Sequence, residues 1–71
     1  MDIHLAIQHI LTEKNITISA VSRESGLTRS YIYKVLSGRH SPTIYTLSRF
    51  AEALEMPLSE LIMVAEGDGF I

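Results

Sequence analysis

The residues of this 71-residue chain with the clearest chemical capability are its arginines and lysines. Five of the six lie between positions 23 and 49, where Glu24 is the one acidic residue, so that interval carries +4 within a chain of net charge −2. They are Arg23, Arg29, Lys34, Arg39 and Arg49. Such side chains neutralise phosphates, and an arginine also fits the O6 and N7 atoms of guanine. Clustering of this kind favours a polyanionic partner, provided that one structural element displays these residues together.

Such an element is predicted around Gly26, where two helix-compatible segments, 18–25 and 29–37, meet. Gly26 suits a tight turn because a positive φ costs energy in any residue with a β-carbon. Ser22 suits the close approach of two crossing helices. Apolar residues on both sides of the glycine are spaced to share one buried face: Val21, Leu27, Ile32 and Val35. The pattern predicts a helix-turn-helix.

Three further helices are predicted, over residues 2–14, 44–55 and 58–65. Asp2 and Thr43 are expected to cap the first two of these helices, as Thr17 and Thr28 cap the helices of the motif. Asn15 is expected to end the first helix in a left-handed conformation. The sequence contains no internal repeat and no linker long enough to join a second domain. We therefore expect an all-α, compact five-helix domain over residues 1–66, followed by a C-terminal tail, 67–71.

Together these segments resemble the Cro/repressor-type (XRE-like) helix-turn-helix DNA-binding family over about residues 3–62. The resemblance rests on the turn at Gly26 with Ile32 and Val35, on S-G-R-H-S-P at 37–42 and on T-L-S-R-F-A-E-A-L at 46–54. It implies a lambda-repressor-like fold and a sequence-specific transcriptional regulator, which we interpret as a repressor. An antitoxin, or another protein-interaction module on the same fold, is the alternative.

The chain departs from the pattern of similar proteins at three places. Leu11 and Leu36 stand where those proteins often pair an arginine with a glutamate, so we expect the two leucines to pack together instead. Ile18 replaces a glutamine that reaches DNA phosphate. Glu55 stands where helix 44–55 usually ends at glycine or asparagine, which predicts a strained C-terminal cap.

If helix 29–37 enters the major groove of double-stranded DNA, its first residues meet base edges. Arg29 can donate two hydrogen bonds to guanine, and Lys34 can reach guanine or a phosphate. Ser30 lets the helix approach closely. Tyr33 follows the buried Ile32, so it should be exposed, where it can pack against a thymine methyl group or bond a phosphate.

A second group of residues is expected to contact DNA phosphates. Arg39 and the amide of Thr43, at a helix N-terminus, offer a ready phosphate site. Ser19 is expected to substitute for the missing glutamine. For Tyr31, packing at the core edge and a phosphate contact remain equal alternatives. The complete set is Thr17, Ser19, Arg23, Thr28, Tyr31, Arg39, His40, Ser41 and Thr43.

The remaining polar residues are given structural roles. Arg49 is expected to form a surface salt bridge with Glu52 or Glu55. His4 and His9 are expected to be plain helix-surface residues, because five positions apart they point to different sides of a helix and do not form a metal-ligand set.

Several classes of protein are disfavoured by what the sequence lacks. It has no cysteine, no glycine-rich phosphate loop and no carboxylate pair that the fold would place in a pocket, so we expect no enzyme, no metal and no cofactor. The longest apolar run, 61–65, is too short to span a membrane, and the first residues lack the basic start of a signal peptide. We expect a cytoplasmic protein without a membrane partner.

The C-terminal end carries more apolar residues than the core of one domain needs. We expect them to form a homodimer interface that places two recognition helices on a palindromic operator. A frayed tail with singly exposed apolar residues is the alternative. A toxin or co-regulator as a further protein partner is left open. The expected interface residues are Met63, Val64, Phe70 and Ile71.

Overall fold

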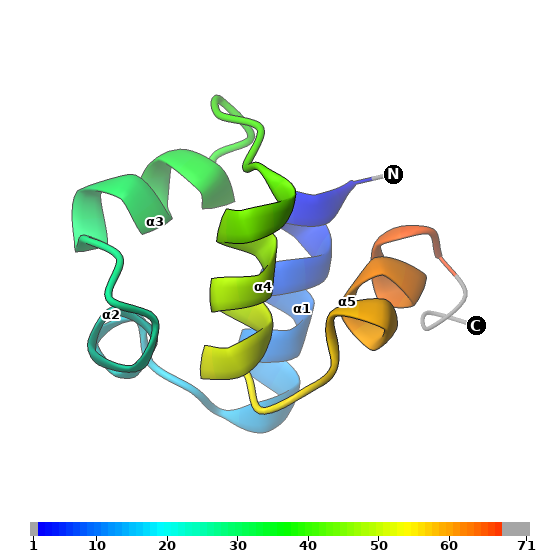
Figure 1. Ribbon diagram of the computed structural model, residues 1–71, viewed down its shortest axis with the longest axis horizontal. Coiled ribbons are helices and arrows are strands. Elements are labelled where there is room, and N and C mark those ends of the chain that lie inside the picture. Colours follow the sequence, from blue (N-terminus) through cyan, green and yellow to red (C-terminus); the bar gives the residue numbers. More distant parts are fainter. Residues whose placement is uncertain (1, 68–71) are drawn as a thin grey trace.

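The computed structural model describes residues 2–67, which form five α-helices and no strand (Figure 1). The helices are α1 (Ile3–Lys14), α2 (Ile18–Ser25), α3 (Arg29–Leu36), α4 (Ile44–Ala53) and α5 (Leu58–Ala65). Their packing closes a ring, in which α1 contacts α3, α3 contacts α2, α2 contacts α4, α4 contacts α5, and α5 returns to α1. The predicted all-α fold with a helix-turn-helix is confirmed. The division into a domain over 1–66 and a tail stays a prediction.

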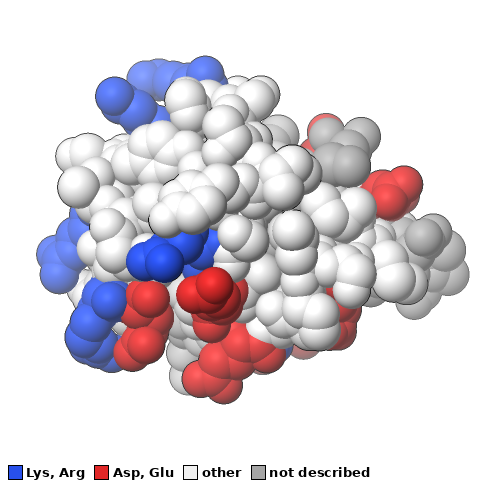
Figure 2. Space-filling view, in the orientation of Figure 1, with Lys and Arg blue, Asp and Glu red and all other residues white. Residues whose placement is uncertain are grey.

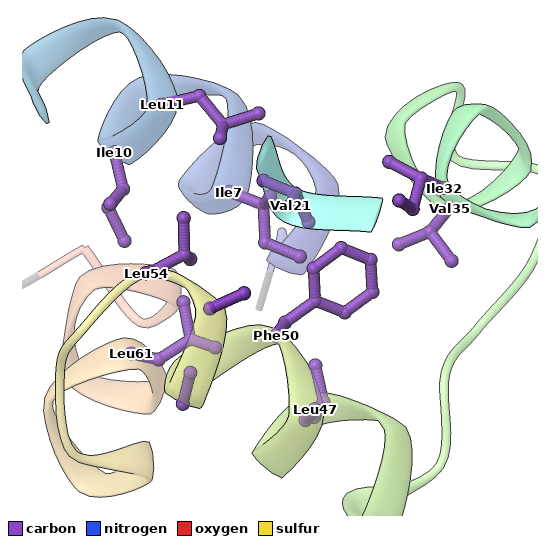
Figure 3. Close-up of a cluster of buried hydrophobic side chains, with 12 residues drawn as sticks. Ile7, Ile10, Leu11, Val21, Ile32, Val35, Leu47, Phe50, Leu54 and Leu61 are labelled. Atoms are coloured by element: carbon purple, nitrogen blue, oxygen red, sulfur yellow. The ribbon is translucent and has the colours of Figure 1, made fainter. Parts of the chain in front are cut away.

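The core fills the centre of this ring, and Phe50 of α4 lies in it with no exposed surface. In Figure 3 its ring points toward side chains of the other helices, among them Ile7 of α1 and Ile32 and Val35 of α3. Val21, Ile32 and Val35 are fully buried, as the shared face of the motif predicts, whereas Leu27 is only half-buried. The apolar side chains of the motif therefore hold α2 and α3 against one core.

Threonine residues cap the N-termini of α2, α3 and α4. The hydroxyl oxygens of Thr17, Thr28 and Thr43 each accept a hydrogen bond from a first-turn amide, at 3.1, 3.2 and 3.2 Å. These three predicted caps are confirmed. Asp2 stands at the N-cap position of α1, but its side chain makes no capping hydrogen bond. Instead its backbone N–H donates to the carbonyl oxygen of Ala65 at 3.3 Å, which ties the start of α1 to the end of α5.

Two helices end earlier than the sequence pattern indicates. α3 ends at Leu36 and α4 at Ala53, because Ser37 and Leu54 already serve as their C-caps. Leu36 is half-buried against the core, and its carbonyl oxygen accepts a hydrogen bond from the Gln8 side chain at 2.7 Å. Leu11 is buried on α1, which packs on α3. Direct contact between the two leucines stays a prediction.

Left-handed residues follow α1 and α4. Asn15 has a φ of 56°, a conformation that asparagine tolerates well, and Glu55 has a φ of 58°. A glutamate side chain gains no local hydrogen bond that would offset this conformation, so the φ of Glu55 supports the strain expected at this cap. The chain turns here because the amide of Met56 donates to the carbonyl oxygen of Ala51 at 3.0 Å.

Glu55→Gly is expected to raise the free energy of unfolding by about 0.5–1 kcal/mol, because glycine adopts a positive φ without the steric cost of a β-carbon. The greater freedom of glycine in the unfolded chain offsets part of the gain. Urea denaturation followed by circular dichroism measures the change. Glu52→Gly, on the exposed face of α4, is the control and should cost about 1 kcal/mol. A less stable Glu55→Gly variant would show that the cap is not strained.

Candidate nucleic-acid interface

The four residues expected to read bases lie together on the exposed side of α3. Arg29, Ser30, Tyr33 and Lys34 are all exposed, and the side chain of Tyr33 retains 58% of its accessible surface. Positions 29, 30, 33 and 34 share one helical face, opposite the buried Val35. Because α3 begins at Arg29, this stripe starts directly after the turn of the motif. The structure thus presents these side chains outward, and their contact with bases stays a prediction.

The turn between α2 and α3 is held by hydrogen bonds from two serines. Gly26 takes a φ of 77°, as the turn requires. The hydroxyl of Ser22 donates to the carbonyl oxygen of Leu27 at 2.6 Å, and the hydroxyl oxygen of Ser25 accepts from the amide of Leu27 at 3.1 Å. Ser22 therefore fits this position by its hydrogen bond as well as by its size. The role of Ser25 in the turn was not predicted from the sequence, although this residue retains only 1% of its accessible surface.

The expectation for Arg49 is wrong. Its Nε donates to the carbonyl oxygen of Ser25 at 2.9 Å, and no ion pair joins it to Glu52 or Glu55 within residues 2–67. The physical reason is the packing of α4 on α2, which places the half-buried guanidinium against the C-terminal end of α2. Carbonyl groups there lack helical partners and carry partial negative charge.

The loop after α3 exposes Arg39, His40 and Ser41. The His40 ring stands edge-on to the ring of Tyr31, with centroids 5.0 Å apart and planes at 69°. Tyr31 is itself half-buried against the core, which supports its core-edge role without testing a phosphate contact. The aromatic contact restrains one side of the loop next to the exposed stripe of α3.

His4 is not the plain surface residue that we expected. It is half-buried, and its imidazole lies beneath the loop: a β-carbon added at Gly38 would come within 3.3 Å of its Nε2 atom. The loop can approach α1 this closely because Gly38 has no side chain and takes a φ of 79°. His9 lies 3.9 Å from Glu13, four residues along α1.

The other residues expected to contact phosphates lie on α2 or at the starts of α2, α3 and α4. Thr17, Ser19, Thr28 and Thr43 are exposed near the starts of α2, α3 and α4, and three of these hydroxyl oxygens already accept capping bonds. The capping hydroxyls of Thr17 and Thr28 still carry a hydrogen to donate, whereas the hydroxyl of Thr43 already donates to the hydroxyl oxygen of Thr46 at 3.2 Å. Arg23 is exposed on α2, with Nε 3.6 Å from a carboxylate oxygen of its neighbour Glu24.

Charge is segregated over the molecular surface. In Figure 2 the arginines and lysines lie mainly over α2, α3 and the loop between α3 and α4. Acidic side chains gather on the lower and right-hand parts of the same view, toward the end of α4 and α5. This segregation follows the sequence, in which the central interval is basic and the flanks are acidic. One side of the molecule therefore suits a polyanion although the net charge is negative.

Among residues 2–67, large exposed apolar side chains occur at the expected dimer surface and elsewhere, including Leu5 on α1, which retains 49% of its accessible surface. Met63 retains 53% of its accessible surface and Val64 is half-buried, while Phe70 and Ile71 lie outside the described residues. The most exposed apolar side chains lie in the first turn of α4, where Ile44 and Tyr45 retain 66% and 71%. The sequence reasoning missed this pair, although two adjacent apolar residues ahead of the buried stripe of α4 were a visible signal.

The fold and the motif define a helix-turn-helix protein. A family model described as HTH_3, helix-turn-helix, matches residues 7–61. The chain belongs to this XRE-type family, and it is a DNA-binding helix-turn-helix regulator. No curated protein and no solved structure matches the chain. Among the described residues, no helix is long and apolar enough to span a membrane, and no group of three or more candidate ligands is placed to hold a metal ion.

Proposed function

We propose that the chain is a sequence-specific transcriptional repressor, which inserts α3 into the major groove and binds a palindromic operator as a homodimer. The observation that carries the proposal is the exposed stripe at the start of α3, Arg29, Ser30, Tyr33 and Lys34, set directly after a turn that is fixed by hydrogen bonds. Side chains that read bases must be exposed and held in a defined direction, and the stripe meets both requirements.

Each member of the stripe has a chemical role in the proposal. The guanidinium of Arg29 donates to O6 and N7 of one guanine, which no other base pair satisfies in the same geometry. Ser30 is short enough to let the helix approach the bases. Lys34, one turn further along, reaches a guanine or a phosphate. Tyr33 packs against a thymine methyl group or donates its phenol hydrogen to a phosphate.

Phosphate contacts surround this stripe and fix its register on the duplex. Arg39, His40 and Ser41 approach one phosphate group from the loop after α3. The amides in the first turn of α4, after Thr43, add donors at a positive helix end. The remaining members of this set are Thr17, Ser19, Arg23, Thr28 and Tyr31.

Arg39→Ala is expected to weaken binding to the operator and to an unrelated duplex by the same factor. It should also reduce the slope of log affinity against log salt by about one unit, because one fewer phosphate is neutralised. Fluorescence anisotropy at several salt concentrations measures both quantities. Lys14→Ala removes the same charge outside the proposed interface and should leave the slope unchanged. A loss confined to the operator would assign Arg39 to base reading instead.

The proposed dimer is supported by the exposed Met63 beside Val64 on α5. Pairing of two such surfaces across a two-fold axis would set the recognition helices about one DNA turn apart, roughly 34 Å. The two half-sites of the operator would then form an inverted repeat.

Met63→Glu is expected to shift the protein from dimer to monomer, because it places a charge in an apolar contact that would have to be desolvated. Sedimentation velocity of the free protein at micromolar concentration measures the change. Ile44→Glu introduces the same charge at the exposed start of α4 and should leave the dimer intact. A wild-type protein that sediments as a monomer would contradict the free dimer.

Selection of binding sites from random duplex DNA tests the proposal as a whole. We expect enrichment of an inverted repeat with half-sites about one helical turn apart and a guanine in each half-site. A protein-interaction module without DNA recognition would enrich no sequence, and it would not bind duplex DNA even at low salt.

A further inference from the structure

We infer that Arg49 is a positioning residue, which holds α3 in the orientation needed for base reading by locking the turn of the motif from α4. The inference rests on the proposed role of α3 as the recognition helix. Arg49 would touch no DNA in this account. It would act through the backbone of α2, at the turn that leads into α3.

The guanidinium of Arg49 lies against two consecutive residues of the turn. Its Nε donates to the carbonyl oxygen of Ser25, the last residue of α2, at 2.9 Å. A β-carbon added at Gly26 would lie 3.0 Å from its Nη2 atom. Gly26 is thus favoured by its φ of 77°, and its lack of a β-carbon also leaves the arginine its present position.

Ser25 is connected to the start of α3 by the backbone and by two hydrogen bonds of the turn. The Ser25 hydroxyl oxygen accepts from the amide of Leu27, and the Ser22 hydroxyl donates to the carbonyl oxygen of Leu27. The next residue, Thr28, caps α3 and precedes Arg29, the first residue of the stripe. Four positions separate the carbonyl held by Arg49 from the side chain expected to contact guanine, so a shift of the turn moves that side chain directly.

The other end of the lock is anchored in the core. Arg49 precedes Phe50, which has no exposed surface, so the backbone that carries the guanidinium is fixed by packing. A charged donor on an unpartnered helix carbonyl makes a stronger hydrogen bond than a neutral donor, and partial burial of Arg49 limits competition from water. The bond therefore joins a part of α4 that is packed in the core to the turn.

Loss of this lock should affect base reading more than phosphate binding. A bidentate arginine–guanine contact depends on direction as well as distance, whereas attraction between cations and phosphates tolerates small displacements. The quantity to measure is consequently the ratio of affinities for the operator and for a scrambled duplex, and not either affinity alone.

Lys14 provides a matched control within the same chain. Its Nζ donates to the carbonyl oxygen of Leu54, the C-cap of α4, at 2.7 Å. This bond also runs from a cation to a carbonyl at the end of a helix, but it joins α1 to α4 and does not touch α2 or α3. Lys14→Met and Arg49→Met remove the same charge and the same kind of bond, and both keep an apolar side chain.

The experiment compares both variants with wild type by fluorescence anisotropy, under conditions in which circular dichroism shows that all are folded. We expect Arg49→Met to lower the operator-to-scrambled ratio by about tenfold, the effect of one lost charge-assisted hydrogen bond. Lys14→Met should keep the ratio within about twofold of wild type. Arg49→Lys should restore part of the ratio, because its ammonium group can still donate to Ser25.

The outcomes separate this inference from the proposed function. An unchanged ratio in Arg49→Met, or an equal fall in Lys14→Met, would overturn the positioning role while wild-type discrimination still supports the proposed function. Wild type that binds both duplexes equally would overturn the proposed function. Hydrogen exchange then tests the effect of Arg49 on the turn without DNA. Arg49→Met should speed exchange of the Leu27 amide more than exchange of the Leu54 amide, each compared with wild type. An equal effect at both amides would contradict the proposed role of Arg49.

Discussion

Phe50→Ala is expected to lower the free energy of unfolding by about 3–5 kcal/mol, the range measured for removal of large buried aromatic side chains. The Phe50 ring has no exposed surface and lies among side chains from the other helices (Figure 3). Alanine would leave a cavity that a ring of short helices cannot fill without changing their contacts. Because domains of this size are only marginally stable, a large part of the protein should be unfolded at 37 °C.

Urea denaturation followed by circular dichroism measures this effect, with Tyr45→Ala as the control. Tyr45 is an aromatic residue on the same helix, but it retains 71% of its accessible surface. Its replacement should change the free energy of unfolding by less than about 0.5 kcal/mol. A cost below about 1 kcal/mol for Phe50→Ala would mean that the core can repack, and that α3 is held less rigidly than the structure implies.

Arg29→Ala is expected to reduce affinity for the operator by about 1–3 kcal/mol, and to do so at a single base position. Arg29 is the first residue of α3 and is fully available to a partner, because none of the hydrogen bonds or ion pairs within residues 2–67 involves its side chain. Removing it should make all four base pairs nearly equivalent at that position, while the other positions of the operator keep their preferences.

Affinities for single-base variants of the operator, compared between wild type and Arg29→Ala, measure this prediction. Arg23→Ala, which removes an exposed arginine from α2, serves as the comparison because it should weaken all the variants alike. If Arg29→Ala also weakened all of them alike, α3 would be oriented in the groove differently from the proposal.

Those features of the fold that depend on local chemistry could be predicted from the sequence. A threonine directly before a segment with helical spacing indicates an N-cap, and this signal occurs at Thr17, Thr28 and Thr43. The positive φ of Gly26 likewise follows from the residue types that a turn accepts, whereas the expectation for Glu55 came from the pattern of the similar family. The apolar spacing of Ile32 and Val35 indicates which face of α3 is buried and hence which is exposed.

Contacts between distant parts of the chain could not be predicted in the same way. Arg49 was given a partner close to it in sequence, Glu52 or Glu55, but its Nε donates to the carbonyl oxygen of Ser25, 24 residues away. That acceptor is a backbone carbonyl, which every residue has, so the residue types in the sequence do not indicate it. His4 beneath Gly38, and His40 against Tyr31, also depend on how the loop after α3 folds back.

Titration of duplex DNA at two salt concentrations tests the central claim most directly. The 71-residue chain is titrated into its selected operator and into a scrambled duplex of equal length, at about 50 and 200 mM salt. We predict preference for the operator at both concentrations and, if six phosphates are neutralised, a loss of roughly 10³-fold in affinity between them. Equal affinities for the two duplexes would contradict base reading by α3, and the absence of binding at the lower salt concentration would contradict DNA recognition by this chain.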